Sequence, residues 1–212
     1  MARTENPKDV NDPDLAAAGT VLFPFLRTLA HDMAAPLTST LGYAQLNLEA
    51  PGSPEELRDD LQQIEQAALS LRQKLGCLSR LSRYVPSEVV SPAGELLTDL
   101  RSLTGTLSMS AGQRLKWQQQ EPFSEDKLKG NPWLLRAACL ALLGSLCNDA
   151  TEVAVTRIEG AVAICFPPPN EAVVQAAPNL WGCPSLGERL LERQAIPLEK
   201  NELWRICLTL EG

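Results

Sequence analysis

The chain has 212 residues, a formal net charge of −7, 21% charged residues and 44% apolar residues, which is typical of a globular protein with one or two domains. This acidic balance argues against nucleic-acid binding, because no dense basic patch is available to neutralise phosphates. No apolar run is long enough to span a bilayer and no signal peptide is recognisable, so we expect a cytoplasmic protein without membrane contact.

The first helix is expected to begin at Asp12 and Pro13, after a flexible tail over residues 1–12. Gly19 and Pro24 are expected to interrupt it, which leaves a firm helix over residues 25–49. Helical stepping then predicts one apolar stripe, made of Leu22, Leu26, Leu29, Met33, Leu37, Leu41, Ala44 and Leu48.

His31 is the only histidine in the chain, and the stepping puts it about 140° from the centre of this stripe, on the side that faces water. Asp32 follows directly, and a carboxylate can accept one ring N–H while the other ring nitrogen remains a nucleophile. A solitary histidine on a polar helix face is usually only solvated. Pro36, however, predicts a bend one turn later, since proline inside a helix costs about 3 kcal/mol.

The second helix is expected to begin with a capping box from Ser53 to Glu56, with Pro54 in the first position. Its apolar residues form a heptad seam: Leu57, Leu61, Ile64, Ala68, Leu71, Leu75 and Leu78. A solitary helical hairpin is one interpretation, but two helices cannot cover each other's apolar surface completely. We therefore expect a homodimer in which two hairpins form a four-helix bundle over residues 13–84.

A linker is predicted over residues 85–95, and residues 96–212 then change to shorter elements. Helices are expected over 96–107, from Asn131 and Pro132 to about 148, and from a capping box at Ser185 to residue 193. Strands are expected over 114–120, 152–158, 161–166 and 204–210. The order predicts an α+β fold, with a long helical hairpin followed by an α/β sandwich. The six cysteines are predicted to be reduced thiols in the apolar core, without a metal site.

The sequence around His31 resembles the H-box of two-component sensor histidine kinases. The matching residues are His31, Asp32, Met33, Pro36, Leu37, Thr38, Leu41, Gly42 and Tyr43. The resemblance implies that His31 accepts a phosphoryl group and that Asp32 polarises it. Ala34 and Ala35 depart from the family pattern, which has a basic residue and a Thr or Asn there. The second departure puts phosphatase activity in doubt.

The second half resembles a degenerate ATP-binding domain of the same kinases. In this resemblance, Asn148 matches the magnesium-holding asparagine of the family's N-box and is vestigial at best. Gly144 replaces the first asparagine of that box. The Asp-x-Gly-x-Gly motif has no counterpart, and the glycine-rich loop is reduced to Gly182 and Gly187. Phosphates need backbone N–H groups that glycines leave accessible. We therefore expect no nucleotide cofactor and no metal ion.

The resulting hypothesis is a histidine phosphotransferase of a phosphorelay, similar to bacterial sporulation and cell-cycle phosphotransferases. Its partners would be a phosphodonor, either a kinase or a receiver, and a receiver-domain aspartate. His31 and Asp32 would be catalytic. The expected partner-binding residues are Arg27, Ala35, Thr38, Gly42 and Gln45. Two alternatives remain: a divergent but active sensor kinase, and a non-catalytic dimeric scaffold or inhibitor of a kinase or response regulator.

Overall fold

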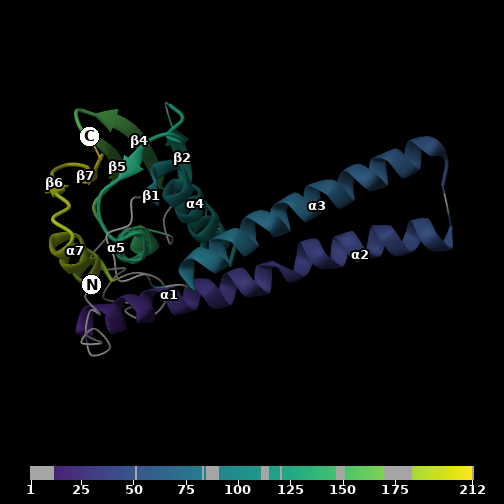
Figure 1. Cartoon of the computed structure of the whole chain (residues 1–212), viewed down its shortest axis with the longest axis horizontal. Helices are drawn as coiled ribbons and strands as arrows, with labels where there is room; N and C mark the ends of the chain where they lie inside the picture. Colours follow the sequence, from purple (N-terminus) through teal and green to yellow (C-terminus); the bar gives the residue numbers. More distant parts are fainter. Residues whose placement is uncertain are drawn as a thin grey trace, which may run out of the picture. The chain divides into compact units, whose positions relative to one another are not determined.

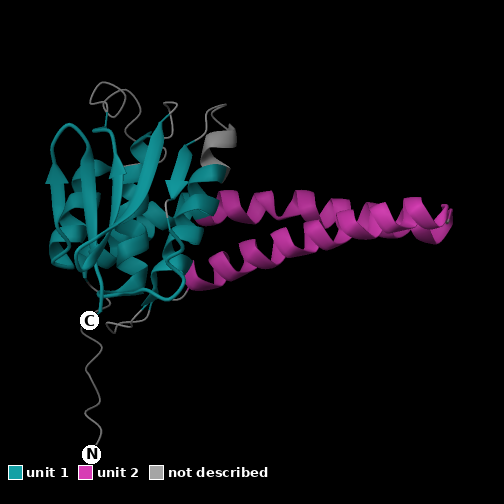
Figure 2. Cartoon of the chain, turned by 90° about the horizontal axis from the view of Figure 1, so that it is seen from above, with its two compact units in different colours: residues 1–25, 84–212 teal, residues 26–83 magenta. Residues whose placement is uncertain are grey.

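The computed structural model describes residues 12–50, 52–82, 84, 91–110, 115–119, 121–146, 151–169 and 183–211. The chain divides into two compact units, one made of residues 1–25 and 84–212 and the other of residues 26–83 (Figure 2). Long helices form the second unit, and a sheet with helices forms the first (Figure 1). The predicted α+β fold class is confirmed.

The unit of residues 26–83 is a helical hairpin. It contains the end of α1 (Pro13–Asp32), then α2 (Ala34–Glu49) and α3 (Pro54–Leu81). The predicted capping box starts α3: Ser53 Oγ accepts from the Glu56 backbone N–H at 3.4 Å, and Glu56 Oε2 accepts from the Ser53 N–H at 2.7 Å. Near this end, Asn47 Nδ2 donates to Asp60 Oδ2 at 2.9 Å, which joins α2 to α3.

The other unit is built on a five-stranded sheet with the strand order β2-β4-β5-β7-β6. Only β2 and β4 run parallel, and the remaining neighbours are antiparallel. The strands are β2 (Lys116–Gln119), β4 (Glu152–Ile158), β5 (Ala161–Phe166), β6 (Leu198–Lys200) and β7 (Trp204–Thr209). A second sheet pairs β1 (Ser91–Pro92) with β3 (Lys127–Leu128). The predicted turn between β4 and β5 contains Gly160 with a φ of 68°, a left-handed conformation that favours glycine.

The helices of this unit are α4 (Ala93–Ser110), α5 (Pro132–Leu143) with a 3₁₀ turn (Gly144–Leu146), and α7 (Pro184–Arg193). Asn131 caps α5 as predicted, because its Oδ1 accepts from the backbone N–H groups of Trp133 at 3.0 Å and Leu134 at 3.2 Å. Every residue over 134–146 is buried. The buried Arg136 of α5 donates from Nε to Asp99 of α4 at 2.8 Å, so its charge is paired.

The first half of α1 belongs to the same unit as the sheet. The prediction that Gly19 and Pro24 interrupt this helix is wrong, since α1 is continuous from Pro13 to Asp32. Leu22 and Phe25, on either side of Pro24, are almost fully buried. Burying one such side chain contributes about 1.5–3 kcal/mol, which offsets the proline's cost of about 3 kcal/mol.

The capping box predicted at Ser185 is also wrong. The residue that precedes α7 is Cys183, which makes no side-chain cap, and Pro184 takes the first helical position. Glu188, the expected second member of the box, instead forms an ion pair with Lys200 of β6. The proline alone fits the start of the helix, because its missing N–H would have no helical partner there.

Candidate functional site

The candidate site lies where α1 ends and α2 begins. Pro36 has no N–H, so it cannot donate to the Asp32 carbonyl four residues earlier. The helical bonds on either side persist, from Met33 N–H to Leu29 O at 3.2 Å and from Leu37 N–H to Met33 O at 3.3 Å. Met33 is the single residue between the two helices and keeps helical dihedral angles, with φ −75° and ψ −19°. The helix is therefore interrupted at Met33, three residues before Pro36, while the bend predicted one turn after His31 stays a prediction.

A lysine from the facing helix takes the place of the missing donor. Lys74 of α3 donates from Nζ to the Asp32 carbonyl oxygen at 3.0 Å, in a partly buried contact. The lysine was not predicted from the sequence. The register of the hairpin is the sequence signal that could have indicated this contact. Lys74 and Asp32 are 42 residues apart, and Ser53, which caps α3, lies midway between them.

His31 is the last basic residue of α1, and its side chain is 88% exposed. Its Nδ1 lies 3.7 Å from Oδ1 of Asp32, whose side chain is 28% exposed. This distance is too long for a hydrogen bond. The carboxylate nevertheless lies beside one ring nitrogen, while the exposed ring is accessible to a reacting partner. Catalytic hydrogen bonds are often long before a partner binds.

The predicted partner-binding residues follow the same stretch of chain. Arg27 is exposed on α1, one turn before His31, and Ala35, Thr38 and Gln45 are exposed on α2. Gly42 is half-buried, and a Cβ added there would meet nothing within 4 Å. The structure therefore leaves all five positions accessible, at the three- to four-residue spacing of one helix face.

The predicted apolar stripe is only partly covered. Leu22 and Leu29 are buried, but Leu37, Leu41 and Leu48 beyond the break are exposed. The half-buried side chains of α2 include Thr40, Tyr43 and Asn47 instead. On α3, none of the seven predicted seam residues is buried, and Leu57, Leu61 and Leu75 are exposed. The hairpin thus presents apolar surface on both helices.

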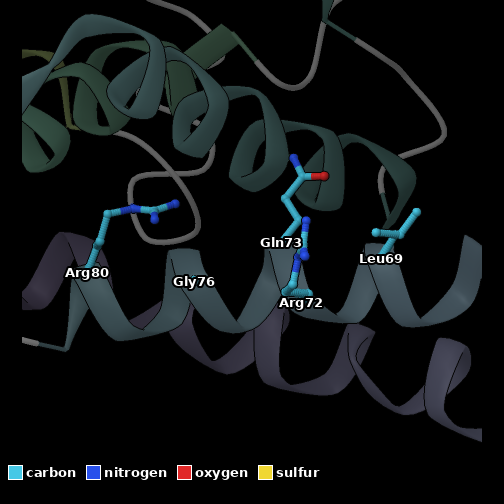
Figure 3. A pocket seen from close by; sticks show the side chains of 5 residues that line it. All are labelled: Leu69, Arg72, Gln73, Gly76 and Arg80. Atoms are coloured by element: carbon cyan, nitrogen blue, oxygen red, sulfur yellow. The ribbon is translucent and has the colours of Figure 1, made fainter. Parts of the chain in front are cut away.

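A hollow of about 440 Å³ lies along another face of α3 (Figure 3). It is lined by Leu69, Arg72, Gln73, Gly76 and Arg80. None of the predicted site residues is among them. Arg80 folds back along the helix, so that a Cβ at Gly76 would lie 3.3 Å from its Nη1.

The residues predicted as remnants of a nucleotide site belong to the sheet-containing unit. The predicted vestigial residue Asn148 and the predicted loop residue Gly182 lie outside the described residues. Gly187 of α7 packs closely on α5, since a Cβ there would lie 2.7 Å from Leu142 Cγ and 3.0 Å from the Ala138 carbonyl oxygen. This glycine serves helix packing, and α5 presents no exposed polar face among its described residues.

No helix in the described part of the chain is long and apolar enough to cross a membrane. No group of three or more His, Cys, Asp or Glu side chains there is arranged to hold a metal ion.

Comparison with known families finds a match over the hairpin. Residues 24–84 match the family model described as "His Kinase A (phospho-acceptor) domain". The matched span includes the break, His31 and Asp32, together with α2 and α3. The resemblance to the phospho-acceptor part of a two-component histidine kinase core is confirmed there. No curated protein matches the sequence.

Solved structures that this chain resembles include the Acinetobacter baumannii histidine kinase AdeS. It is 9% identical, with 86% of this chain and 98% of that chain covered at a TM-score of 0.44. The cytoplasmic segment of histidine kinase QseC is 17% identical over 72% and 93% of the two chains, with a TM-score of 0.42. A bacterial phosphotransferase is 12% identical over 92% and 96%, with a TM-score of 0.36.

Proposed function

We propose that this chain, whose residues 24–84 match a phospho-acceptor domain, is a histidine phosphotransferase of a two-component phosphorelay. The observation that supports this most directly is the exposed His31 beside Asp32 at the helix break. In this proposal, His31 carries a phosphoryl group from a phosphodonor to an aspartate of a receiver domain.

The transfer can be written with the residues of the site. The neutral ring holds its proton on Nδ1, facing Asp32, and offers the lone pair of Nε2. From an aspartyl phosphate donor, Nε2 attacks phosphorus, a P–N bond forms, and the P–O bond breaks as the donor carboxylate leaves with the electron pair. The proton stays on Nδ1, where Asp32 offsets the charge that the ring gains. In the second transfer a receiver carboxylate attacks phosphorus, and the P–N bond breaks.

The receiver would dock along the exposed face that continues from His31. Arg27 lies one helical turn away, where its guanidinium could hold phosphoryl oxygens. Thr38 and Gln45 offer polar contacts, and the open space at Gly42 allows a close approach of the partner. Ala35 adds a small side chain beside His31, so it does not obstruct the ring.

We infer that the phosphoryl group comes from another protein rather than from ATP bound to this chain. The inference is supported by the absence of the Asp-x-Gly-x-Gly motif and of the glycine-rich loop from the sequence. It is also supported by the burial of residues 134–146, which form α5 and its 3₁₀ turn and precede Asn148. Calorimetry of the full chain with Mg-ATP should show no binding tighter than about 1 mM, which corresponds to about 4 kcal/mol. A micromolar dissociation constant would contradict this inference and favour the divergent kinase.

We also propose that the functional form is a homodimer, in which two hairpins bury their exposed leucines in a four-helix bundle. The proposal is supported by the uncovered seam of α3 and by the exposed leucines of α2 beyond the break. The cytoplasmic location remains a prediction from the sequence.

The decisive experiment follows label transfer to one residue. The full chain is incubated with a ³²P-labelled receiver domain or autophosphorylated kinase, and acid-labile label is sought on His31. Wild type should acquire the label and His31→Ala should not, while Asp32→Asn should slow the transfer without loss of partner binding. Label on the His31→Ala variant would show that the acceptor is elsewhere. Partner binding without labelling of wild type would favour the scaffold.

A further inference from the structure

We propose that Lys74 is a positioning residue for His31: it holds the helix break that sets Asp32 beside the imidazole. This inference rests on the proposed function, because it assigns Lys74 a part in phosphoryl transfer. The juxtaposition that carries it is the contact from Lys74 Nζ to the carbonyl oxygen of Asp32, the residue whose carboxylate neighbours His31 Nδ1.

The contact replaces a specific lost bond. The Asp32 carbonyl has no helical donor, because Pro36 lacks an N–H. A partly buried carbonyl without a partner is unfavourable by about 1–3 kcal/mol, whereas an ammonium donor makes a charge-assisted hydrogen bond that is stronger than a neutral one. At 3.0 Å, Lys74 satisfies this carbonyl directly. The lysine thus replaces the hydrogen-bond donor that Pro36 lacks, and does not only contribute to the packing of α2 on α3.

The position of the contact explains why it acts on His31. The Asp32 carbonyl belongs to the peptide that links α1 to Met33, the single residue between the helices. Fixing that peptide fixes the backbone of Asp32, and therefore the direction from which its carboxylate approaches His31 Nδ1, 3.7 Å away. The N–H side of this peptide is held by the bond from Met33 to the Leu29 carbonyl at 3.2 Å. Without Lys74, the carbonyl side would lack its donor, so the peptide could tilt toward water and the carboxylate would shift with it.

The hairpin offers a matched control for this reasoning. Asn47 Nδ2 donates to Asp60 Oδ2 at 2.9 Å, which is also a polar contact between α2 and α3 but lies near the other end of α2. Asn47→Ala removes one hairpin contact without touching the break. If Lys74 acts only by stabilising the hairpin, Asn47→Ala and Lys74→Met should have similar effects.

The test uses the single histidine as a spectroscopic probe. In NMR spectra of the full chain with ¹⁵N-labelled histidine, the chemical shifts of the two ring nitrogens report the ratio of the Nδ1–H and Nε2–H tautomers. These signals arise from His31 alone, because it is the single histidine. The same variants are then phosphorylated with phosphoramidate, in which the P–N bond breaks, a P–N bond to the ring forms, and ammonia leaves. Circular dichroism and thermal melting identify variants that fail to fold.

Lys74→Met should shift the tautomer ratio toward that of Asp32→Asn and slow phosphorylation by about tenfold, as expected for a small misplacement of a reacting pair. Lys74→Arg, which keeps the charge and the donor, should restore both properties to within about twofold of wild type. Asn47→Ala should match wild type. The inference is overturned if Lys74→Met keeps the wild-type ring spectrum and rate, or if Asn47→Ala behaves like Lys74→Met.

The proposed function and the proposed role of Lys74 can be refuted independently of each other. If phosphorylated partners never label His31, the relay is wrong. The ring spectrum still decides whether Lys74 positions the pair, because the tautomer ratio needs no phosphoryl donor.

Discussion

Two leucines of α3 with nearly the same exposure provide a sharp test of the proposed dimer. Leu75 belongs to the predicted seam and is 47% exposed, whereas Leu69 lies in the hollow of Figure 3 and is 48% exposed. The two lie about 120° apart around the helix axis. A dimer that uses the seam should bury Leu75 and leave Leu69 outside the interface.

The size of the effect follows from the exposed area. Complete burial of a leucine side chain contributes about 1.5–3 kcal/mol, so burial of the exposed half of Leu75 contributes about 1 kcal/mol per copy. Each dimer contains two copies. Leu75→Ala should therefore weaken association by about 2 kcal/mol, or about 30-fold in the dissociation constant. Leu75→Glu should abolish the dimer at micromolar concentration, since it would place two unpaired carboxylates in an apolar interface.

Sedimentation velocity over a concentration series measures these dissociation constants. Leu69→Ala is the control, because it removes the same side chain at the same exposure from the same helix and should leave association unchanged. The reasoning is refuted if wild type sediments as a monomer at micromolar concentration, or if the Leu69 and Leu75 variants weaken association equally.

Three further outcomes are expected. His31→Ala should change the free energy of unfolding by about 0.5 kcal/mol or less in urea titrations, because the side chain is exposed; a larger loss would make the histidine structural. The hydrogen bond from Arg193 lowers the pKa of Asp12 from 3.8 to about 2, so its stabilising contribution is complete above pH 4 and is lost as the pH falls toward 2. Asp12→Asn should therefore destabilise the protein at pH 6 but much less at pH 2, by thermal unfolding. Burial raises the pKa of the Cys139 thiol to about 12. A thiol reagent added to the native protein should therefore modify the exposed Cys183 but not Cys139. Mass spectrometry that finds Cys139 modified without unfolding would contradict this.

The elements of the fold were largely predictable where the signal is local. The capping box at Ser53, the cap at Asn131 and the turn at Gly160 each depend on residues within a few positions, and the structure has all three. Helix continuity through Pro24 was not predictable in this way, because it depends on the burial of Leu22 and Phe25 in the folded protein.

The candidate site shows the same limit. The exposure of His31 follows from helical stepping, and a bend near Pro36 is expected from the missing N–H of proline. Lys74 could not be assigned from its neighbours, since its partner is a backbone carbonyl 42 residues away. The hydroxyl of Thr40, which donates to the Pro36 carbonyl at 2.9 Å, is likewise a contact that the apolar stripe does not indicate.

The sheet-containing unit is continuous in space but assembled from two separate stretches of chain. Residues 12–25 belong to it, and Asp14 lies 2.9 Å from Arg189 of α7 in an ion pair. A fragment cut at the predicted linker would therefore lack these residues, including the buried Leu22 and Phe25 and the ion pair with Arg189. Attempts to isolate this unit should instead splice residue 25 to residue 84 through a short glycine-rich connection and leave out the hairpin alone.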